Sequence, residues 1–574
     1  MWLTSLAVRR TVCLAALVGF AALAPVRADS VGDDARARQV DALLKEYERP
    51  GSPGGVLGIY HHGKMVYSRG FGQADLEQGR ANTPQTKFHV ASVSKQFTAF
   101  AIALLASQGK IDLDADIRKY LPRLTNLDRK VTVRQLVLHT SGLRDQWALM
   151  VLGGHSMAGV IDQQQILNVV ERQAGWNFEP GSEQLYSNTN YTLLAEIVKA
   201  VSGRTLRQYT TENIFQPLGM TSTFFYDDVT ELVPNRANSY ERNGDRWTRV
   251  LLNYNNVGAT SLLTTAEDMV KWVGNFAQPK VGDAALIEQV STLGKLNDGS
   301  VTNYAFGLRR FVVGGHETVT HSGKDAGFLS YVGYVPGQDF GFFLGTNLSF
   351  NLRSLLDRIT EVYIGNGPAD DGWPTAVATP ATLVAELSGS YRNDRLPLLE
   401  LVSKDGRLNI RTGGELLPTE FWSDGTFGYG PHYREHYRIL RDAGGKVAGI
   451  ERVSIRDVTR LSYQRAKPVA APKPESLRDV LGDYRIPELD VTYTLALEEG
   501  QLVLKSLWTT QPIVVTPREK DRFELSLPEA GESVMLIERN AAGRVTGARI
   551  HAGRIRNVAM ERQAKAELRA QASF

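Results

Sequence analysis

The sequence predicts an α/β domain followed by two small antiparallel β-barrels. Residues 34–363 read as a helix, two strands, a helical block, three strands and a last helix, which fits a sheet built from both ends of this segment. Two linkers follow: 366–374 contains Pro and Gly, and 467–474 is rich in Pro. Each linker precedes a strand-rich block of about a hundred residues, a common size for one domain. A chain of 574 residues is also too long for one core, so we expect several domains.

The N-terminal segment 1–28 is typical of a secretory signal peptide. Arg9 and Arg10 form its basic part, and residues 11–26 are apolar over a length that suits a signal and is short for a membrane span. Val26-Arg27-Ala28 has small residues at the positions that a signal peptidase reads, which predicts cleavage after Ala28. The alternative is a membrane anchor that stays attached. We therefore expect an exported protein, periplasmic or secreted.

Composition narrows the range of partners once this signal is removed. Cys13, the single cysteine, lies inside the signal, so we expect neither a disulfide nor thiol chemistry in the mature chain. Cleavage also removes three arginines and leaves 62 basic and 62 acidic residues. A neutral chain gives no electrostatic reason to expect nucleic acid or an anionic membrane as a partner. No later segment is long and apolar enough to span a bilayer.

The first elements of the α/β domain are a helix and a hairpin. Residues 34–47 have the pattern of an amphipathic helix, and 55–60 and 65–69 read as two paired strands. His61 and His62 lie at the tip of this hairpin, with no third ligand at metal spacing. We therefore expect no metal site.

The motif Ser92-x-x-Lys95 is the first candidate for chemistry. Apolar residues at steps of three and four over 97–105, with Gly109 as a C-terminal cap, predict a helix. If that helix begins at Ser92, both side chains lie on one face. An amine that burial keeps neutral can take the proton of the serine, and the backbone N–H of Ser92 can face an oxyanion. Alone, the motif is more often a cap serine followed by a solvated lysine.

A second candidate, Tyr186-x-Asn188, lies in a loop before a helix over 191–198. In an extended loop, two residues at this spacing point to the same side. A phenol near a cation can relay a proton, and a side-chain amide can hold a substrate carbonyl. His139 lies in another loop, where bonding to the backbone is a more common role than catalysis.

The end of the α/β domain reads as strands. Alternating and apolar runs predict strands at 307–313, 327–335 and 340–345, and a helix at 352–363. Between the first two strands lies the segment 319–324, which carries the sequence His-Ser-Gly-Lys.

The two strand-rich blocks, 376–467 and 474–574, are repeats of each other. Both alternate apolar and polar residues between turns, and neither contains a long helix. The matching runs are Leu387-Ser-Gly-Ser-Tyr391 with Leu481-Gly-Asp-Tyr484, and Gly445-Lys-Val-Ala-Gly449 with Gly543-Arg-Val-Thr-Gly547. Two small antiparallel barrels are the natural interpretation.

The motifs Ser92-x-x-Lys95, Tyr186-x-Asn188 and His321-x-Gly323, in this order, resemble those of the penicillin-recognising serine hydrolases. This family includes class C beta-lactamases, DD-peptidases, family VIII esterases and D-aminopeptidases. The runs 139–143 and 217–220 also resemble family sequences. The resemblance covers roughly residues 30–365 and implies a beta-lactamase-like catalytic domain over 29–366, in which a sheet and a helical domain enclose the site.

The resemblance also implies a role for each matching residue. Ser92 would be the acylated nucleophile, and Lys95 and Tyr186 would share the proton transfers. Asn188 would hold the substrate carbonyl, and His321 would support Tyr186 or the substrate. No cofactor is implied.

The third motif departs from the beta-lactamase pattern. Those enzymes usually have Lys-Thr-Gly, whose cation binds a substrate carboxylate, whereas His321 is largely neutral near pH 7. This weakens the case for a beta-lactamase or a carboxypeptidase, although Lys324 is a nearby cation. Gly323 and Lys324 are expected to bind substrate, with the N–H groups of Ser92 and Lys324 as the oxyanion hole.

The C-terminal blocks narrow the resemblance further. A catalytic domain followed by two lipocalin-like barrels resembles the bacterial D-aminopeptidase arrangement, in which a loop of the last barrel reaches the site and helps select a free amino terminus. The alternative is that the barrels only rigidify or oligomerise the enzyme. The family's link to cell-wall peptides agrees with a periplasmic location.

We therefore expect an exported acyl-enzyme hydrolase of small amides or peptides, similar to a D-aminopeptidase. The first alternative is an esterase with the same mechanism, since both reactions pass through a tetrahedral intermediate. Beta-lactamase or DD-peptidase activity is a further alternative within the family. A third hypothesis is a sensor that acylates and stalls, or a surface binder. The expected partner is a small amide, peptide or ester, and the sequence is compatible with a homo-oligomer.

Overall fold

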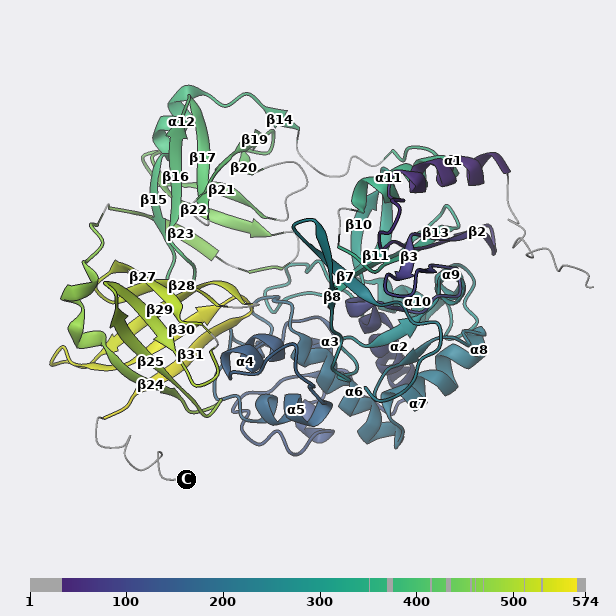
Figure 1. Ribbon diagram of the computed structural model, residues 1–574, viewed down its shortest axis with the longest axis horizontal. Coiled ribbons are helices and arrows are strands. Elements are labelled where there is room, and N and C mark those ends of the chain that lie inside the picture. The colour runs from purple at the N-terminus through teal and green to yellow at the C-terminus, as the bar shows by residue number, and fades with distance from the viewer. Residues whose placement is uncertain are drawn as a thin grey trace, which may run out of the picture.

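The computed structural model shows an N-terminal α/β domain and two C-terminal β domains, drawn at the right, the upper left and the lower left of Figure 1. The signal expected at 1–28, with Cys13, lies outside the described residues, as does most of the first linker. The residues that the structure describes are 34–349, 352–368, 375–412, 415–429, 435–454, 457–459, 461–467, 469–509, 511–527 and 530–564.

A six-stranded antiparallel sheet forms the centre of the α/β domain, in the order β10-β11-β12-β13-β1-β2. The first hairpin pairs with the last strand, so both ends of the segment build one sheet, as the sequence predicts. The strands are β1 Gly55–His61, β2 Lys64–Phe71, β10 Arg309–Val313, β11 His316–Asp325, β12 Phe328–Val335 and β13 Phe340–Thr346.

The expectation of three strands at this end of the domain is wrong, because β11 is a fourth strand. Its polar run His321–Lys324 interrupts the apolar alternation that identifies a strand. The pattern is broken because this part of β11 lies beside the turn that carries Ser92. A Cβ atom at Gly323 would overlap the carbonyl oxygen of Val90, so only glycine allows this approach.

Helices cover both faces of the sheet. Helices α1 (Asp34–Lys45) and α11 (Arg353–Ile364) pack together on one face, through residues such as Leu44 and Ile359. Helix α9 (Ala266–Ala277) packs on β1 and β13 from the other face. Among the described residues, no helix is long and apolar enough to cross a bilayer.

The helical block lies beyond α9 and centres on α2 (Ser94–Ser107) and α6 (Asn188–Ser202), which pack against each other. Every residue of α2 from Ser94 to Leu105 is buried, so this helix has no solvent face along most of its length. The other helices are α3 Val133–Val137, α4 Gln146–Leu152, α5 Gln163–Glu171, α7 Leu206–Thr210, α8 Gln216–Leu218 and α10 Ala284–Ser291, with a π-helical turn at Thr211–Phe215.

Short strands fix the approach to Ser92. Strand β5 belongs to a three-stranded sheet with the order β5-β9-β6. It ends just before the 3-10 turn Ala91–Val93 that contains this serine. The short strands of the domain are β3 Gln73–Asp75, β4 Arg80–Ala81, β5 Phe88–His89, β6 Phe224–Phe225, β7 Ser239–Asn243, β8 Arg246–Val250 and β9 Leu262–Thr264, and a second 3-10 turn spans Ile117–Lys119.

The last domain is a closed antiparallel barrel of eight strands, as expected. Its interior is filled by apolar side chains, including Tyr484, Phe523 and Met560. The strands are β24 Gly482–Ile486, β25 Val491–Glu498, β26 Gln501–Lys505, β27 Ile513–Glu519, β28 Arg522–Leu527, β29 Gly531–Arg539, β30 Val545–Ala552 and β31 Ile555–Arg562, with 3-10 turns at Pro474–Ser476 and Arg478–Val480.

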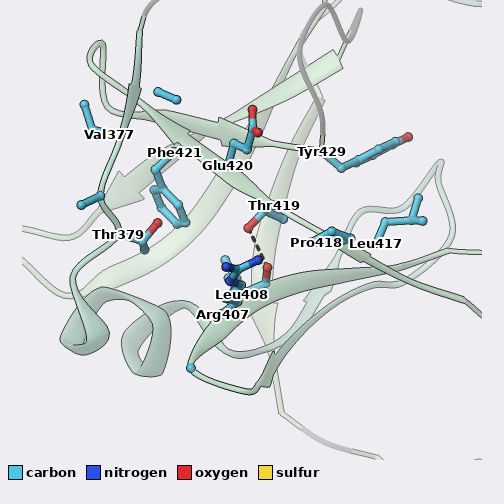
Figure 2. A pocket seen from close by; sticks show the side chains of 13 residues that line it. Val377, Thr379, Arg407, Leu408, Leu417, Pro418, Thr419, Glu420, Phe421 and Tyr429 are labelled. Carbon is cyan, nitrogen blue, oxygen red and sulfur yellow. Dashed lines mark hydrogen bonds between the residues drawn. The ribbon is translucent and has the colours of Figure 1, made fainter.

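The domain before it is a ten-stranded curled sheet whose end strands, β14 and β18, do not pair in the described part of the chain. A cavity of about 620 Å³ lies there, lined by Phe421, Glu420 and Tyr429 among others (Figure 2). The elements are β14 Ala376–Val377, α12 Ala381–Leu387, β15 Gly389–Arg392, β16 Leu399–Lys404, β17 Arg407–Thr412, β18 Glu415–Pro418, β19 Glu420–Trp422, β20 Thr426–Gly428, β21 Glu435–Arg441, β22 Val447–Ser454 and β23 Leu461–Ala466.

The structure shows that the two β domains are repeats at the level of single hydrogen bonds. The hydroxyl of Tyr391 donates to the carbonyl of Leu387 at 2.7 Å, and that of Tyr484 donates to the carbonyl of Val480 at 2.6 Å. In each domain an arginine of the last strand donates a hydrogen bond to a backbone carbonyl in the same turn. Arg465 donates to the carbonyl of Ser388, and Arg562 donates to that of Leu481.

Candidate active site

Ser92 and Lys95 lie together at the start of α2. The α-helix begins at Ser94, two residues later than the motif suggests, and Ser92 lies in the 3-10 turn before it. Lys95 Nζ is 3.1 Å from Ser92 Oγ. Ala91, directly before the serine, has a φ of 48°, which is strained for a residue with a side chain. The tight turn therefore presents Ser92 toward the lysine.

The surroundings of Lys95 favour a neutral amine. The side chain is fully buried, and burial lowers its pKa from the ordinary value of 10.5, although the neighbouring Tyr186 opposes this shift. Nζ donates to Asn188 Oδ1 at 2.9 Å and to the carbonyl of Ala259 at 2.6 Å. A neutral amine has two N–H groups and a lone pair. The two oxygens take both N–H groups, so the lone pair is left for the proton of Ser92.

This geometry predicts that activity falls on acidification through the pKa of Lys95, because protonation removes the lone pair. Replacing Lys95 by arginine, which does not deprotonate, should lower kcat/KM by about 10²–10⁴-fold. A pH profile of kcat/KM checks both. Burial holds the pKa values of His139 and His321 well below 6.5, so a limb above neutral pH is not theirs. A kcat/KM that does not fall on acidification while the protein stays folded, or an active arginine variant, would contradict this role for Lys95.

Tyr186 lies directly over the lysine. Its ring centroid is 4.8 Å from Lys95 Nζ, and its buried hydroxyl has no hydrogen-bond partner within the described parts of the chain. The ring of His139 packs on it at 4.2 Å. Nδ1 of His139 accepts a hydrogen bond from the backbone N–H of Ser187 at 3.1 Å, which confirms the backbone-bonding role predicted for this histidine. The phenol is thus held in place by the contacts of its ring.

Asn188 is held by Asp145, a residue that the motifs do not identify. The backbone N–H and the side-chain amide of Asn188 both donate to Asp145 Oδ2, at 2.7 and 2.8 Å. Because the amide nitrogen is fixed in this way, Oδ1 turns toward Lys95. Asp145 also caps α4 by accepting from the backbone N–H of Trp147 at 3.0 Å. An aspartate before a helix signals such a cap, but nothing local signals its contact with Asn188.

Replacing Asp145 separates these two roles. In Asp145→Ser the hydroxyl keeps the helix cap and the bonds to Asn188 are lost, whereas Asp145→Ala loses both. We expect kcat/KM to fall by about 10²-fold in both variants, because the released amide no longer orients Lys95. Only the alanine variant should lose about 1 kcal/mol of helix-cap stability as well. Kinetics and thermal unfolding distinguish these effects, and unchanged kcat/KM in the serine variant would contradict the orienting role.

His321 lies in β11 and bonds to a tyrosine other than Tyr186. Its Nδ1 lies 2.7 Å from the carbonyl of Ser322 and therefore carries a proton. Burial lowers the pKa of the ring well below 6.5, so the imidazole is neutral and Nε2 accepts from the hydroxyl of Tyr304 at 2.9 Å. The ring of Tyr186 is 6.3 Å away, centroid to centroid. No sequence motif identifies Tyr304.

Gly323 and Lys324 complete the third motif. Gly323 lies against Val90, beside the turn of Ser92, and the side chain of Lys324 is exposed. Both belong to the ladder between β11 and β12, where Lys324 pairs with Leu329. Among the described residues, no group of three or more His, Cys, Asp or Glu is placed to hold a metal ion.

Both β domains contact the loop that carries Tyr186. The backbone N–H of Tyr186 donates to Asp457 Oδ1 at 3.0 Å, and Gln184 pairs with Val458 in the first β domain. The guanidinium carbon of Arg554, from the closed barrel, lies 4.8 Å from the ring centroid of Tyr186. A cavity of about 480 Å³ opens where the three domains meet.

Arg144, the residue before Asp145, anchors the closed barrel to the catalytic domain. Arg144 is buried, and its Nη1 donates to both carboxylate oxygens of Glu488, at 2.6 and 2.8 Å. It also donates to the backbone carbonyls of Arg556 and Asn557. In Figure 1, α4 lies beside β31 of the barrel. The barrel is therefore joined directly to the segment that orients Asn188.

A serine beside a buried lysine, with a phenol and an amide around the pair, defines a serine hydrolase. Residues 38–363 match the Beta-lactamase family, and the chain belongs to that family.

Known relatives extend the similarity to the C-terminal domains. The chain is 26% identical to a D-aminopeptidase of Brucella canis over 544 residues, which cover 91% of this chain and 98% of the relative. In fold it is similar to the octameric penicillin-binding protein homologue from Pyrococcus abyssi, with a TM-score of 0.53 and 21% identity over 75% of this chain and 99% of that one. FmtA from Staphylococcus aureus has a TM-score of 0.51 and 23% identity over 61% and 95%.

Proposed function

We propose that this serine hydrolase cleaves small amides or peptides through an acyl-enzyme on Ser92, in the manner of a D-aminopeptidase. The observation that carries the proposal is the 3.1 Å contact between Ser92 Oγ and a buried Lys95 whose other donors are occupied. The relative named D-aminopeptidase aligns over nearly its full length, C-terminal domains included, which supports a peptide or amide as substrate.

The chemistry follows from the positions of the side chains. Lys95 takes the proton of Ser92 as Oγ attacks the substrate carbonyl, and the backbone N–H groups of Ser92 and Lys324 are proposed to stabilise the oxyanion. The proton then passes, by way of Tyr186, to the nitrogen of the leaving amine, and the C–N bond breaks. A water molecule attacks the acyl-enzyme carbonyl and Lys95 receives its proton. The bond between Ser92 Oγ and the acyl carbon then breaks, Lys95 returns the proton to Oγ, and a free acid leaves.

The test compares D-alanyl p-nitroanilide with its N-acetylated form, with Ser92→Ala as the blank. Cleavage of the free-amine substrate alone, absent in the variant, supports an aminopeptidase. If neither anilide is cleaved and p-nitrophenyl acetate is turned over, the amide proposal is wrong and the esterase takes its place. The export predicted from residues 1–28 and the homo-oligomer stay predictions.

A further inference from the structure

The hairpin between β30 and β31 brings Arg554 into the active site with a fixed backbone. The carbonyl of Arg554 accepts from the side-chain amide of Asn177 at 2.9 Å and from the backbone N–H of Asp145 at 3.4 Å. The next-but-one residue, Arg556, donates its N–H back to Asn177 Oδ1 at 2.8 Å. The tip is therefore joined to the catalytic domain by its main chain, and the side chain of Arg554 is not needed to hold it there.

The guanidinium of Arg554 has only a long ion pair among the described residues. The nearest acid is Asp145, with 4.0 Å between the ion-pair atoms, and its Oδ2 already accepts two hydrogen bonds from Asn188. Within the described residues, the guanidinium makes no hydrogen bond, and 42% of the side chain is exposed. Three other arginines of the same cavity have close partners: Arg411 with Glu400 at 2.7 Å, Arg518 with Glu524 at 2.6 Å, and Arg556 with Glu183 at 3.0 Å.

We propose that Arg554 binds a carboxylate on the leaving group of the substrate. The inference rests on the proposed function, in which Tyr186 delivers a proton to the leaving nitrogen. The guanidinium lies over the ring of Tyr186, with its carbon 4.8 Å from the ring centroid, and is therefore beside the phenol that is proposed to deliver the proton to the leaving nitrogen. The planar fork of an arginine suits a carboxylate, and the adjoining cavity of about 480 Å³ has room for it.

The substrate class is therefore a short peptide or amide whose leaving portion carries an acid close to the scissile bond. A dipeptide meets this condition through its C-terminal carboxylate. The charge at Arg554 has the wrong sign to attract a free ammonium group, so an amine of the substrate would have to bind elsewhere.

The test uses two substrates that differ by one charge. D-alanyl p-nitroanilide is compared with the same anilide bearing one carboxylate on its ring, and kcat/KM is measured for both. We expect the wild type to prefer the acidic anilide by about tenfold, and Arg554→Gln to lose that preference. Arg554→Lys should keep part of it, and added salt should weaken it in the wild type.

The matched control is Arg544→Gln, an exposed arginine in the turn at the opposite end of β30. It should leave the ratio of the two kcat/KM values unchanged. An equal ratio in the wild type and in Arg554→Gln overturns the proposal, even if both activities fall, because Arg554 would then only position the site. A wild type without preference overturns it as well.

An ester pair separates this inference from the proposed function. If the wild type cleaves neither anilide, p-nitrophenyl acetate and its ring-carboxylated analogue replace them, and the same ratio is measured. A preference for the acidic ester that disappears in Arg554→Gln supports the carboxylate site although the amide proposal has failed. No turnover of either pair contradicts both.

Discussion

Replacing Ser92 by alanine should abolish turnover, with a loss in kcat of about 10⁴-fold or more. Without Oγ there is no nucleophile within reach of the Lys95 lone pair, and the acyl-enzyme does not form. Rates with D-alanyl p-nitroanilide and with p-nitrophenyl acetate, measured on the purified variant, check this. Intact mass gives a second readout, because any acyl adduct should disappear.

Ser94 provides the matched control for this experiment. It lies two residues away, is fully buried, and accepts a hydrogen bond from the backbone N–H of Leu262 at 3.0 Å. Ser94→Ala therefore removes one structural hydrogen bond, which costs about 1 kcal/mol of stability, and leaves the nucleophile in place. Comparable loss of turnover in both variants would mean that the turn itself, and not Oγ of Ser92, is what the reaction needs.

Replacing Glu488 by alanine should lower the stability of the protein by about 3–5 kcal/mol, because it leaves Arg144 buried and unpaired. The side chains of this pair are 2% and 6% exposed, and Glu488 also accepts from the backbone N–H of Ala174 at 2.7 Å. A lower Tm in thermal unfolding, with separation of the barrel from the catalytic domain, is the expected result.

Two further variants test whether the loss of stability comes from the buried pair itself. Glu538→Ala breaks an exposed pair with Arg549 in the same barrel, whose side chains are 41% and 45% exposed, and should cost less than about 1 kcal/mol. The double variant Arg144→Met, Glu488→Met removes both charges and should be more stable than Glu488→Ala alone. Equal Tm values for Glu488→Ala and Glu538→Ala would contradict the anchoring role of the buried pair.

The sequence predicted the parts of the site that short motifs encode. Ser92 and Lys95 are three residues apart, and Tyr186 and Asn188 are two apart, so each pair is readable from local spacing. The structure brings the two pairs together, because α2 and α6 pack against each other. It also places His321 beside Tyr304, a contact across 17 positions that no motif contains.

The residues that the sequence could not identify act across long separations. The carbonyl of Ala259 meets Lys95 across 164 positions, and Arg554 approaches Tyr186 from another domain. Such contacts depend on domain packing and leave no periodic or local pattern. The burial that lowers the pKa of Lys95 is equally invisible in the sequence, since it comes from every element around the side chain.

The fold, like the site, was predicted where it depends on local sequence patterns and not where it depends on long-range contacts. Hydrophobic alternation predicted the central sheet and the strand-rich C-terminal domains, and the repeated turn at Tyr391 and Tyr484 has the same hydrogen bond in both. Hydrophobic alternation did not predict β11, because polar residues near the site replace apolar ones in this strand. Closure of a barrel depends on which strands meet last, so the alternation did not distinguish the closed last domain from the curled sheet that precedes it.

Covalent labelling with a fluorophosphonate, followed by peptide mapping, tests most directly whether Ser92 is the nucleophile. The reagent phosphonylates an activated serine, and residual activity is measured on the same samples. We expect one phosphonyl group on Ser92, incorporated in proportion to the loss of activity, and no label on Ser92→Ala. Activity that is lost with the label on another residue such as Ser94, or that persists with Ser92 fully labelled, would contradict an acyl-enzyme on Ser92.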